Sequence, residues 1–171
     1  MYCVLDLDAT AVDVVSPCDC GKHVEIELNQ SWHHKLAYVH IRPFIREFIK
    51  RHQDAGYKFI VFSANEIGYV TSVSNVLFEG LDPPIGILTE ADLVLQMSTK
   101  SYVKTLATVS NRLGLPEDQL IAIDDNLFMY PYDKRVINPE PWSCRETDDT
   151  EFHHLEIAGG SPLSRLQDAQ P

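Results

Sequence analysis

Two aspartates, Asp6 and Asp8, stand one residue apart, directly after the apolar run of residues 2–5. A short apolar run with sharp ends is typical of a buried strand. If this strand belongs to an open α/β sheet, both carboxylates emerge at the edge where such sheets bind ligands. Neighbouring carboxylates repel each other unless a cation lies between them, and hard oxygen ligands favour Mg²⁺. A strand that simply ends in a polar loop is the alternative, because Asp is a common loop residue.

Further polar residues with chemical potential lie much later in the chain. Ser63 follows a second apolar run, and the pair Asp124 and Asp125 follows a third. Parallel strands place their carboxyl ends at one edge, so these side chains are expected to converge with the first two aspartates. Lys104 is predicted on the exposed side of a helix, near its start, where it can reach the same edge.

This set has the parts that phosphoryl transfer needs. Asp6 can attack phosphorus as a nucleophile and form an aspartyl-phosphate, and Asp8 can protonate the leaving oxygen and then activate water. Ser63 and Lys104 can bind phosphate oxygens, and the later aspartate pair can complete a Mg²⁺ site with Asp6 and Asp8. Taken singly, a serine is more often a helix cap and a lysine a solvated side chain. The order of the residues along the chain supports the chemistry.

Alternating strands and helices are expected to position these residues. Strands are predicted at residues 2–5, 24–28, 36–41, 57–62, 85–88, 120–123 and 135–137. Helices are predicted at residues 43–55, 68–78, 101–113 and 147–155, the last capped by Thr147. The alternation predicts one α/β domain over residues 1–157, with a Rossmann-like parallel sheet and helices on both faces. It has no cap apart from a small β-hairpin insertion, and residues 158–171 are expected to form a flexible tail.

Composition limits the classes of protein. The chain has 171 residues and a formal net charge of −11, which argues against direct binding to nucleic acid. No apolar stretch is long enough to span a membrane, and the first residues do not resemble a secretory signal. We therefore predict an intracellular, nuclear or cytoplasmic protein with four reduced cysteines. The oligomeric state stays open.

A zinc site is the alternative interpretation of one loop. Cys18 and Cys20, with His23 and the pair at 33–34, offer zinc ligands. Only one residue separates the two cysteines, whereas structural zinc sites typically have about two to four, so a solvated loop is preferred. Cys3 lies in an apolar run and is interpreted as a small core residue.

Six short motifs resemble those of the haloacid dehalogenase superfamily. Within it they are most similar to the carboxy-terminal-domain phosphatases of RNA polymerase II, of the TFIIF-associating and small types, also called NLI-interacting-factor-like. In order, they are Asp6-Leu-Asp-Ala-Thr10, Arg42-Pro43-Phe-Ile-Arg-Glu-Phe-Ile49, Phe62-Ser-Ala64, Tyr102-Val-Lys104-Thr-Leu106, Ile123-Asp-Asp-Asn126 and Asp149-Thr-Glu-Phe152. The resemblance covers residues 1–157.

The resemblance implies dependence on Mg²⁺ and a phosphoserine or phosphothreonine substrate in a protein, such as a peptide of the polymerase tail. It also implies substrate contacts from Thr10, Ala64, Asn65, Tyr69, Ile26 and Val24. The last three would form an apolar groove for the peptide, although core packing is the preferred interpretation for Val24. The open site without a large cap suits a macromolecular substrate.

The chain departs from the family pattern in two places. Ala9 stands where the family usually has Glu or Gly, and Leu88-Thr-Glu-Ala91 replaces the element "REsC" that usually precedes the lysine. The BRCT module of the larger relatives is absent from the sequence. Because "REsC" usually contributes peptide contacts, two alternatives stay open. One is a phosphatase for a small-molecule or nucleic-acid-terminal phosphomonoester, and the other is a catalytically silent scaffold that binds phosphopeptides.

Overall fold

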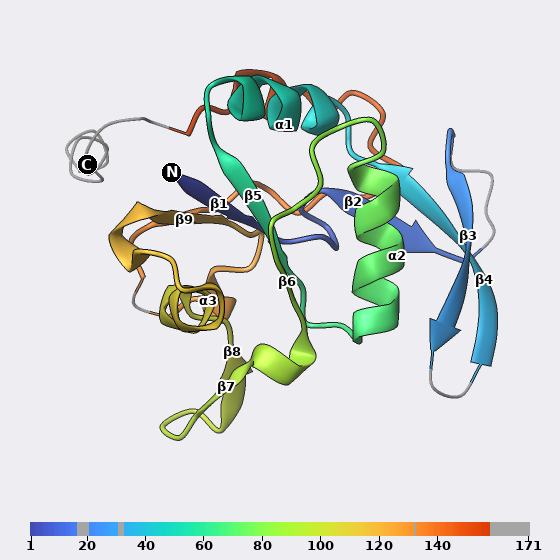
Figure 1. The fold of residues 1–171 in the computed structure, drawn as a ribbon. Helices are drawn as coiled ribbons and strands as arrows, with labels where there is room; N and C mark the ends of the chain where they lie inside the picture. Colours follow the sequence, from blue (N-terminus) through green and yellow to red (C-terminus); the bar gives the residue numbers. More distant parts are fainter. Residues whose placement is uncertain (17–20, 31–32, 132, 158–171) are drawn as a thin grey trace, which may run out of the picture.

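A parallel sheet forms the centre of the molecule. The computed structural model describes residues 1–16, 21–30, 33–131 and 133–157. The strands of the sheet are β1 (Tyr2–Leu5), β5 (Lys58–Phe62), β6 (Ile87–Leu88), β9 (Leu120–Ile123) and β10 (Val136–Ile137). They lie in the order β10-β9-β1-β5-β6, and each neighbouring pair is parallel (Figure 1). The predicted parallel sheet is therefore confirmed.

Helices cover both faces of this sheet, as predicted. They are α1 (Ile45–Asp54), α2 (Ile67–Leu77), α3 (Leu106–Leu113) and α4 (Glu151–His154). Side chains alternate across β1, so Cys3 and Leu5 join the core formed with α1, α2 and α4, while Val4 joins the core formed with α3. Cys3 is fully buried, which confirms its interpretation as a core residue.

The predicted hairpin is part of a second, three-stranded sheet. Its strands are β2 (Val12–Val15), β3 (Val24–Gln30) and β4 (His33–Ile41), antiparallel and in the order β2-β4-β3. The first of these strands was not predicted, because its four residues adjoin a long segment rich in turn formers. Helix α2 packs against β3 and β4 and so lies between the two sheets (Figure 1). Residues 31–32, in the predicted connection, lie outside the described residues.

One predicted helix is wrong in its first turn. Residues Ser101–Val103 form strand β8, which pairs antiparallel with β7 (Val94–Gln96) in a hairpin that projects from the body of the molecule (Figure 1). Aromatic and β-branched residues such as Tyr102 and Val103 favour strands. The helix begins only at Leu106, because the Thr105 hydroxyl accepts a hydrogen bond of 3.0 Å from the Thr108 N–H and caps it.

The last helix is also shorter than predicted. It begins after Thr150 instead of Thr147, because Asp149 turns the chain by accepting a 3.1 Å hydrogen bond from the Glu151 N–H. Three short 3₁₀ helices complete the fold, η1 (Glu90–Asp92), η2 (Glu117–Gln119) and η3 (Leu127–Met129). The predicted tail at residues 158–171 lies outside the described residues. None of the helices in the described ranges is long and apolar enough to cross a membrane.

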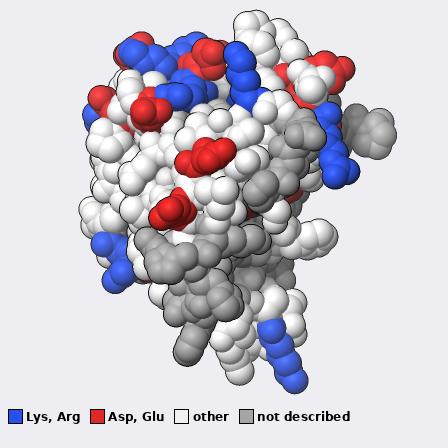
Figure 2. Space-filling model, turned by 90° about the vertical axis from the view of Figure 1, so that its right-hand side faces the viewer, with Lys and Arg blue, Asp and Glu red and all other residues white. Residues whose placement is uncertain are grey.

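Charged side chains of both signs mark the outer surface of α1. Figure 2 shows them near the top of the molecule, at the level where Figure 1 places this helix. Arg46, Lys50 and Arg51 lie there beside Glu47 and Asp54. Such mixed, exposed charges are typical of a solvated helix face.

Candidate active site

Three strand ends converge at one edge of the parallel sheet. Asp6 follows β1, Ser63 follows β5 and Asp124 follows β9. The register aligns Leu5 with both Val61 and Ile123, so the three strands end at nearly the same level. The convergence expected from strand order is therefore present.

Lys104 joins two of these carboxylates. Its Nζ lies 2.5 Å from Asp6 Oδ1 and 2.7 Å from Asp124 Oδ2. The residue follows β8 directly and is only 2% exposed, so its predicted place on the exposed side of a helix is wrong. Burial alone would lower the pKa of Lys104, but the charges of Asp6 and Asp124 outweigh it and raise this pKa. The ammonium group is therefore held in its charged form.

Burial disfavours the charged forms of the two carboxylates, Asp6 and Asp124. Burial raises the pKa of Asp6, although the nearby Lys104 opposes the shift. Burial together with the charge of Asp6 raises the pKa of Asp124 to about 6, against the same opposition from Lys104. Two negative groups in a poorly solvated place gain from a nearby cation, because it stabilises their charged forms.

A third carboxylate completes a cluster that fits a metal ion. One oxygen each of Asp6, Asp124 and Asp125 lie within 4.8 Å of one another. We call these three residues the carboxylate cluster. Three oxygen donors suit Mg²⁺, which is usually bound by a few carboxylates together with water and substrate phosphate. The Asp8 carboxylate is bonded to Asn65 and Tyr69 and is not one of the three, so its role as a fourth side-chain ligand stays a prediction.

Thr10 connects two members of the carboxylate cluster. Its hydroxyl lies 3.1 Å from Asp6 Oδ2 and 2.7 Å from Asp125 Oδ1, and it accepts a 2.9 Å hydrogen bond from the Asp125 N–H. Thr10 is fully buried, which argues against the substrate contact expected for it. The residue instead fixes the spacing between the first motif and the motif Ile123-Asp-Asp-Asn126.

Asp8 is held by two side chains of the segment after β5. Tyr69 donates its hydroxyl hydrogen to Asp8 Oδ1, and Asn65 Nδ2 donates to Asp8 Oδ2 over 2.9 Å. Asn65 also lies 3.3 Å from Ser63 Oγ, so it links the predicted acid and base to the predicted phosphate-binding residue. Burial, with a contribution from the charge of Asp6, raises the pKa of Asp8. A raised pKa suits a group that must donate a proton near neutral pH.

The predicted apolar groove is only partly assembled. Ile26 packs against the core cluster that contains Tyr69, whereas Val24 is 39% exposed. Val24 instead lines a surface pocket of about 500 Å³ together with His23 and Phe44. The core packing preferred for Val24 is therefore wrong, because this residue lies at the free end of β3. His23 stacks on Tyr38, with ring centroids 3.8 Å apart, while Cys18 and Cys20 lie outside the described residues.

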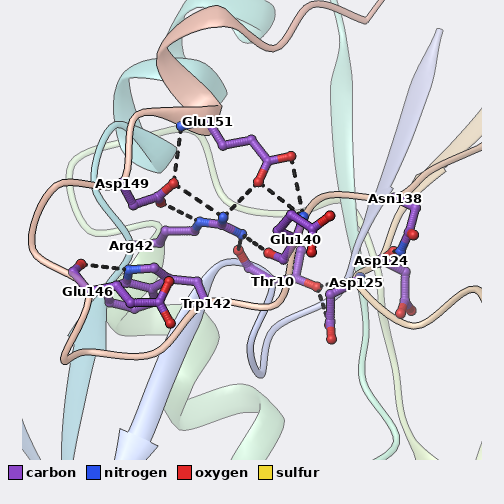
Figure 3. Close-up of polar contacts among 10 residues, drawn as sticks. All are labelled: Thr10, Arg42, Asp124, Asp125, Asn138, Glu140, Trp142, Glu146, Asp149 and Glu151. Carbon is purple, nitrogen blue, oxygen red and sulfur yellow. Dashed lines mark hydrogen bonds and ion pairs between the residues drawn. The ribbon is translucent and has the colours of Figure 1, made fainter.

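Sequence reasoning missed the role of Arg42, which lies just before α1. Arg42 is 2% exposed, and its Nε donates to Asp149 Oδ2 over 2.6 Å while its Nη2 donates to Glu151 Oε2 over 2.9 Å. Its Nη1 donates to the carbonyl oxygens of Thr10 and Glu140, over 3.1 and 3.0 Å (Figure 3). We call these five residues the Arg42 clasp. The motifs that contain Arg42 and Asp149 are both visible in the sequence, but their contact joins residues 107 positions apart.

The segment between β10 and α4 also binds the backbone of the residues that follow β1 and β9. Asn138 Nδ2 donates to the Asp124 carbonyl over 2.8 Å, and the Trp142 N–H donates to the Ala9 carbonyl over 2.7 Å (Figure 3 shows Asn138 and Trp142). Ala9 has a φ of 60°, a left-handed conformation that disfavours residues with a side chain. The departure from Glu or Gly at this position thus falls on a strained backbone.

Comparison with known proteins agrees with this geometry. The parallel sheet with helices on both faces and acidic strand ends is the α/β arrangement expected from the motifs. The profile of the NLI interacting factor-like phosphatases matches residues 1–158. The chain therefore belongs to the NLI interacting factor-like phosphatase family. A search of curated proteins found no match.

Two solved structures resemble the chain. One is Fcp1, an essential RNA polymerase II CTD phosphatase, with a TM-score of 0.65 and 14% identity over 83% of this chain and 42% of that one. The other is a variant of the fission yeast RNA polymerase II CTD phosphatase Fcp1 bound to beryllium fluoride, with a TM-score of 0.62 and 15% identity over 82% of this chain and 41% of that one. This chain thus spans less than half of either protein, and the likeness shows a shared fold.

Proposed function

We propose that the chain is a Mg²⁺-dependent phosphatase for phosphoserine or phosphothreonine in a polypeptide, acting through an aspartyl-phosphate. The observation that carries the proposal is the position of Asp6, which is buried, contacts Lys104 at 2.5 Å and belongs to the carboxylate cluster. Membership of a phosphatase family supports the reaction class. The intracellular location stays a prediction.

The residues suggest two displacement steps. An Asp6 oxygen attacks phosphorus, the bond from phosphorus to the seryl or threonyl oxygen breaks, and Asp8 gives that oxygen a proton. Asp8 then takes a proton from water, whose oxygen attacks phosphorus and releases inorganic phosphate from Asp6. The Lys104 ammonium and the Ser63 hydroxyl stabilise the charge on the transferring group.

Mg²⁺ held by the carboxylate cluster would supply further positive charge to the phosphate oxygens. Without a cation the cluster is unfavourable, because three carboxylates lie close together and the Lys104 ammonium contacts two of them, Asp6 and Asp124. Asp124 and Asp125 both belong to the cluster, so both are proposed as ligands together with Asp6.

A polypeptide substrate is the choice that the shape of the site supports. Between Asp8 and Ser63 the described chain forms the three-stranded sheet, then α1 and β5 of the central fold, so the sheet that packs on α2 takes the place where a cap would be inserted. Ala64 is exposed directly beside the buried Ser63, which leaves a route for a phosphorylated side chain. The two similar structures are phosphatases of the RNA polymerase II CTD, so a peptide of that kind is the first substrate to test.

The test is hydrolysis of a chromogenic phosphomonoester with and without Mg²⁺. We expect turnover that requires Mg²⁺ and falls by at least about 1,000-fold in Asp6→Asn, because the variant lacks the nucleophile. Asp54→Asn is the matched control, since Asp54 is an exposed partner of Lys50 on α1. Full activity in Asp6→Asn would refute the assigned nucleophile, and an inactive wild type would favour a silent scaffold.

A further inference from the structure

Exposed apolar side chains lie on two segments that adjoin Lys104 and Asp125 along the chain. They are Leu95 and Tyr102 on the β7–β8 hairpin and Leu127 and Phe128 in η3, which we call the apolar ridge. These side chains are exposed by 45%, 62%, 50% and 90%, respectively. Large apolar side chains that stay exposed together are typical of a binding surface.

The two parts of the ridge are physically joined. Leu95 and Tyr102 lie directly opposite each other in the hairpin, so their side chains share one face. Strand β8 contacts η3, and the Lys104 N–H donates to the Met129 carbonyl over 2.7 Å. The hairpin and η3 therefore hold their positions relative to one another.

The ridge also begins at the proposed catalytic residues. Tyr102 stands two residues before Lys104, and Leu127 stands two residues after Asp125. Two extended residues span at most about 7 Å. A polypeptide whose phosphorylated side chain reaches Asp6 therefore brings its neighbouring residues within reach of the ridge.

The segments that carry the apolar ridge contain few negative charges. The chain contains 25 acidic residues, yet none falls in residues 93–116, which contain Lys100, Lys104 and Arg112. Residues 126–132 contain no charged residue. Lys104 and Arg112 are paired with carboxylates, but the segments themselves add no negative charge, so a phosphorylated, negatively charged polypeptide meets little repulsion from them. Two copies of the chain, each with a net charge of −11, would instead repel each other.

We propose that the apolar ridge docks the part of the phosphoprotein substrate next to the phosphorylated residue, and that it selects apolar or aromatic side chains there. The inference rests on the proposed phosphatase function and adds a substrate preference to it. Docking at the ridge would make the protein prefer one sequence class among phosphopeptides, independently of the groove expected near Tyr69.

The test compares two phosphoserine peptides and one small substrate. In the first peptide leucine and tyrosine flank the phosphoserine, and in the second glycine and serine replace them. We expect the wild type to cleave the first with a kcat/KM about 10-fold higher, as burial of one large apolar side chain predicts. Phe128→Ser and Tyr102→Ser should each remove most of this preference and leave hydrolysis of p-nitrophenyl phosphate within about two-fold.

Ile85→Ser is the matched control. Ile85 is 46% exposed, but it precedes the amino end of β6, whereas the carboxylate cluster lies at the carboxyl ends of the strands. Its replacement should therefore leave the preference intact. Equal loss of preference in this control, or an unchanged preference in Phe128→Ser and Tyr102→Ser, would overturn the proposal.

Binding separates the ridge from the chemistry. Fluorescence polarisation with the labelled phosphopeptides and Asp6→Asn measures docking without turnover. Weaker binding of the apolar peptide after Phe128→Ser supports the ridge even if the wild type hydrolyses nothing, in which case only the phosphatase function fails. The docking proposal is overturned if Phe128→Ser leaves the affinity for the apolar peptide unchanged. It is also overturned if the wild type sediments as a dimer that Phe128→Ser dissociates.

Discussion

The Arg42 clasp and the apolar ridge adjoin the same carboxylate cluster, but they are built from opposite chemistry. In the clasp a guanidinium that is 2% exposed has every nitrogen bonded to a carboxylate or a carbonyl. In the ridge, side chains are exposed by 45% to 90%. A satisfied buried network fixes geometry, whereas exposed apolar surface contributes little to folding and remains available to a partner.

The largest effect should come from breaking the clasp. Arg42→Met removes the buried guanidinium that binds Asp149, Glu151 and two carbonyl groups, which we expect to cost about 3–5 kcal/mol of unfolding free energy. Urea denaturation measures it. Arg112→Met is the control, because Arg112 is 68% exposed in its ion pair with Asp92 and should cost at most about 1 kcal/mol. Similar midpoints for the two variants would contradict the difference drawn between clasp and surface.

A smaller, pH-dependent effect is expected where the C-terminal segment meets α1. His52 Nδ1 lies 2.9 Å from the Phe48 carbonyl, and His52 Nε2 accepts a 3.2 Å hydrogen bond from the Ile157 N–H, so the neutral ring fits both. Burial lowers the pKa of His52 below 6.5, although the hydrogen bond to the Phe48 carbonyl and the charge of Glu156 partly oppose the shift. The unfolded chain then takes up the proton first as the pH falls.

The stabilisation by His52 is therefore complete above pH 6.5 and is lost as the pH falls through the lower pKa of the folded state. We expect the wild type to lose more stability than His52→Gln when the pH is lowered to about 5. Denaturation curves of the two proteins above pH 6.5 and at a pH of about 5 test this. Equal losses of unfolding free energy in the two proteins would show that the neutral His52 ring does not stabilise the position of Ile157.

Removing the backbone strain at Ala9 should stabilise the folded protein slightly. Ala9→Gly removes the side chain at a φ of 60° and is expected to raise the unfolding free energy by up to about 1 kcal/mol. Ala11→Gly is the control of opposite sign, since Ala11 is fully buried and is not among the residues of positive φ. A lower melting temperature for Ala9→Gly would mean that the loop gains from the methyl group.

The smallest effect should come from the ridge itself. Tyr102→Ser and Phe128→Ser are expected to change the unfolding free energy by no more than about 0.5 kcal/mol each. The fully buried Phe48 is the reference, because Phe48→Ala should cost about 3–5 kcal/mol. Thermal denaturation of the three variants decides whether the ridge is surface or core. A large loss at Phe128 would show that it packs on the fold.

The sequence predicted the meeting of strand ends because parallel sheets place them together whatever the intervening chain does. Asp6, Ser63 and Asp124 follow from that rule alone. Lys104 did not, because the short run Tyr102 to Val103 fits a helix period and a strand equally well. The pairing of Arg42 with Asp149 depends on how the last segment returns across α1, and no local pattern encodes such a path.

The Arg42 clasp also sets an order of events during folding. It ties Arg42 to residues 140–151, a separation of 98 to 109 residues, and contacts this distant are slow to form. During synthesis the first strand emerges long before its clasp. The proposed nucleophile would therefore stay unsupported until the chain has emerged beyond Glu151, so activity reports the completed domain.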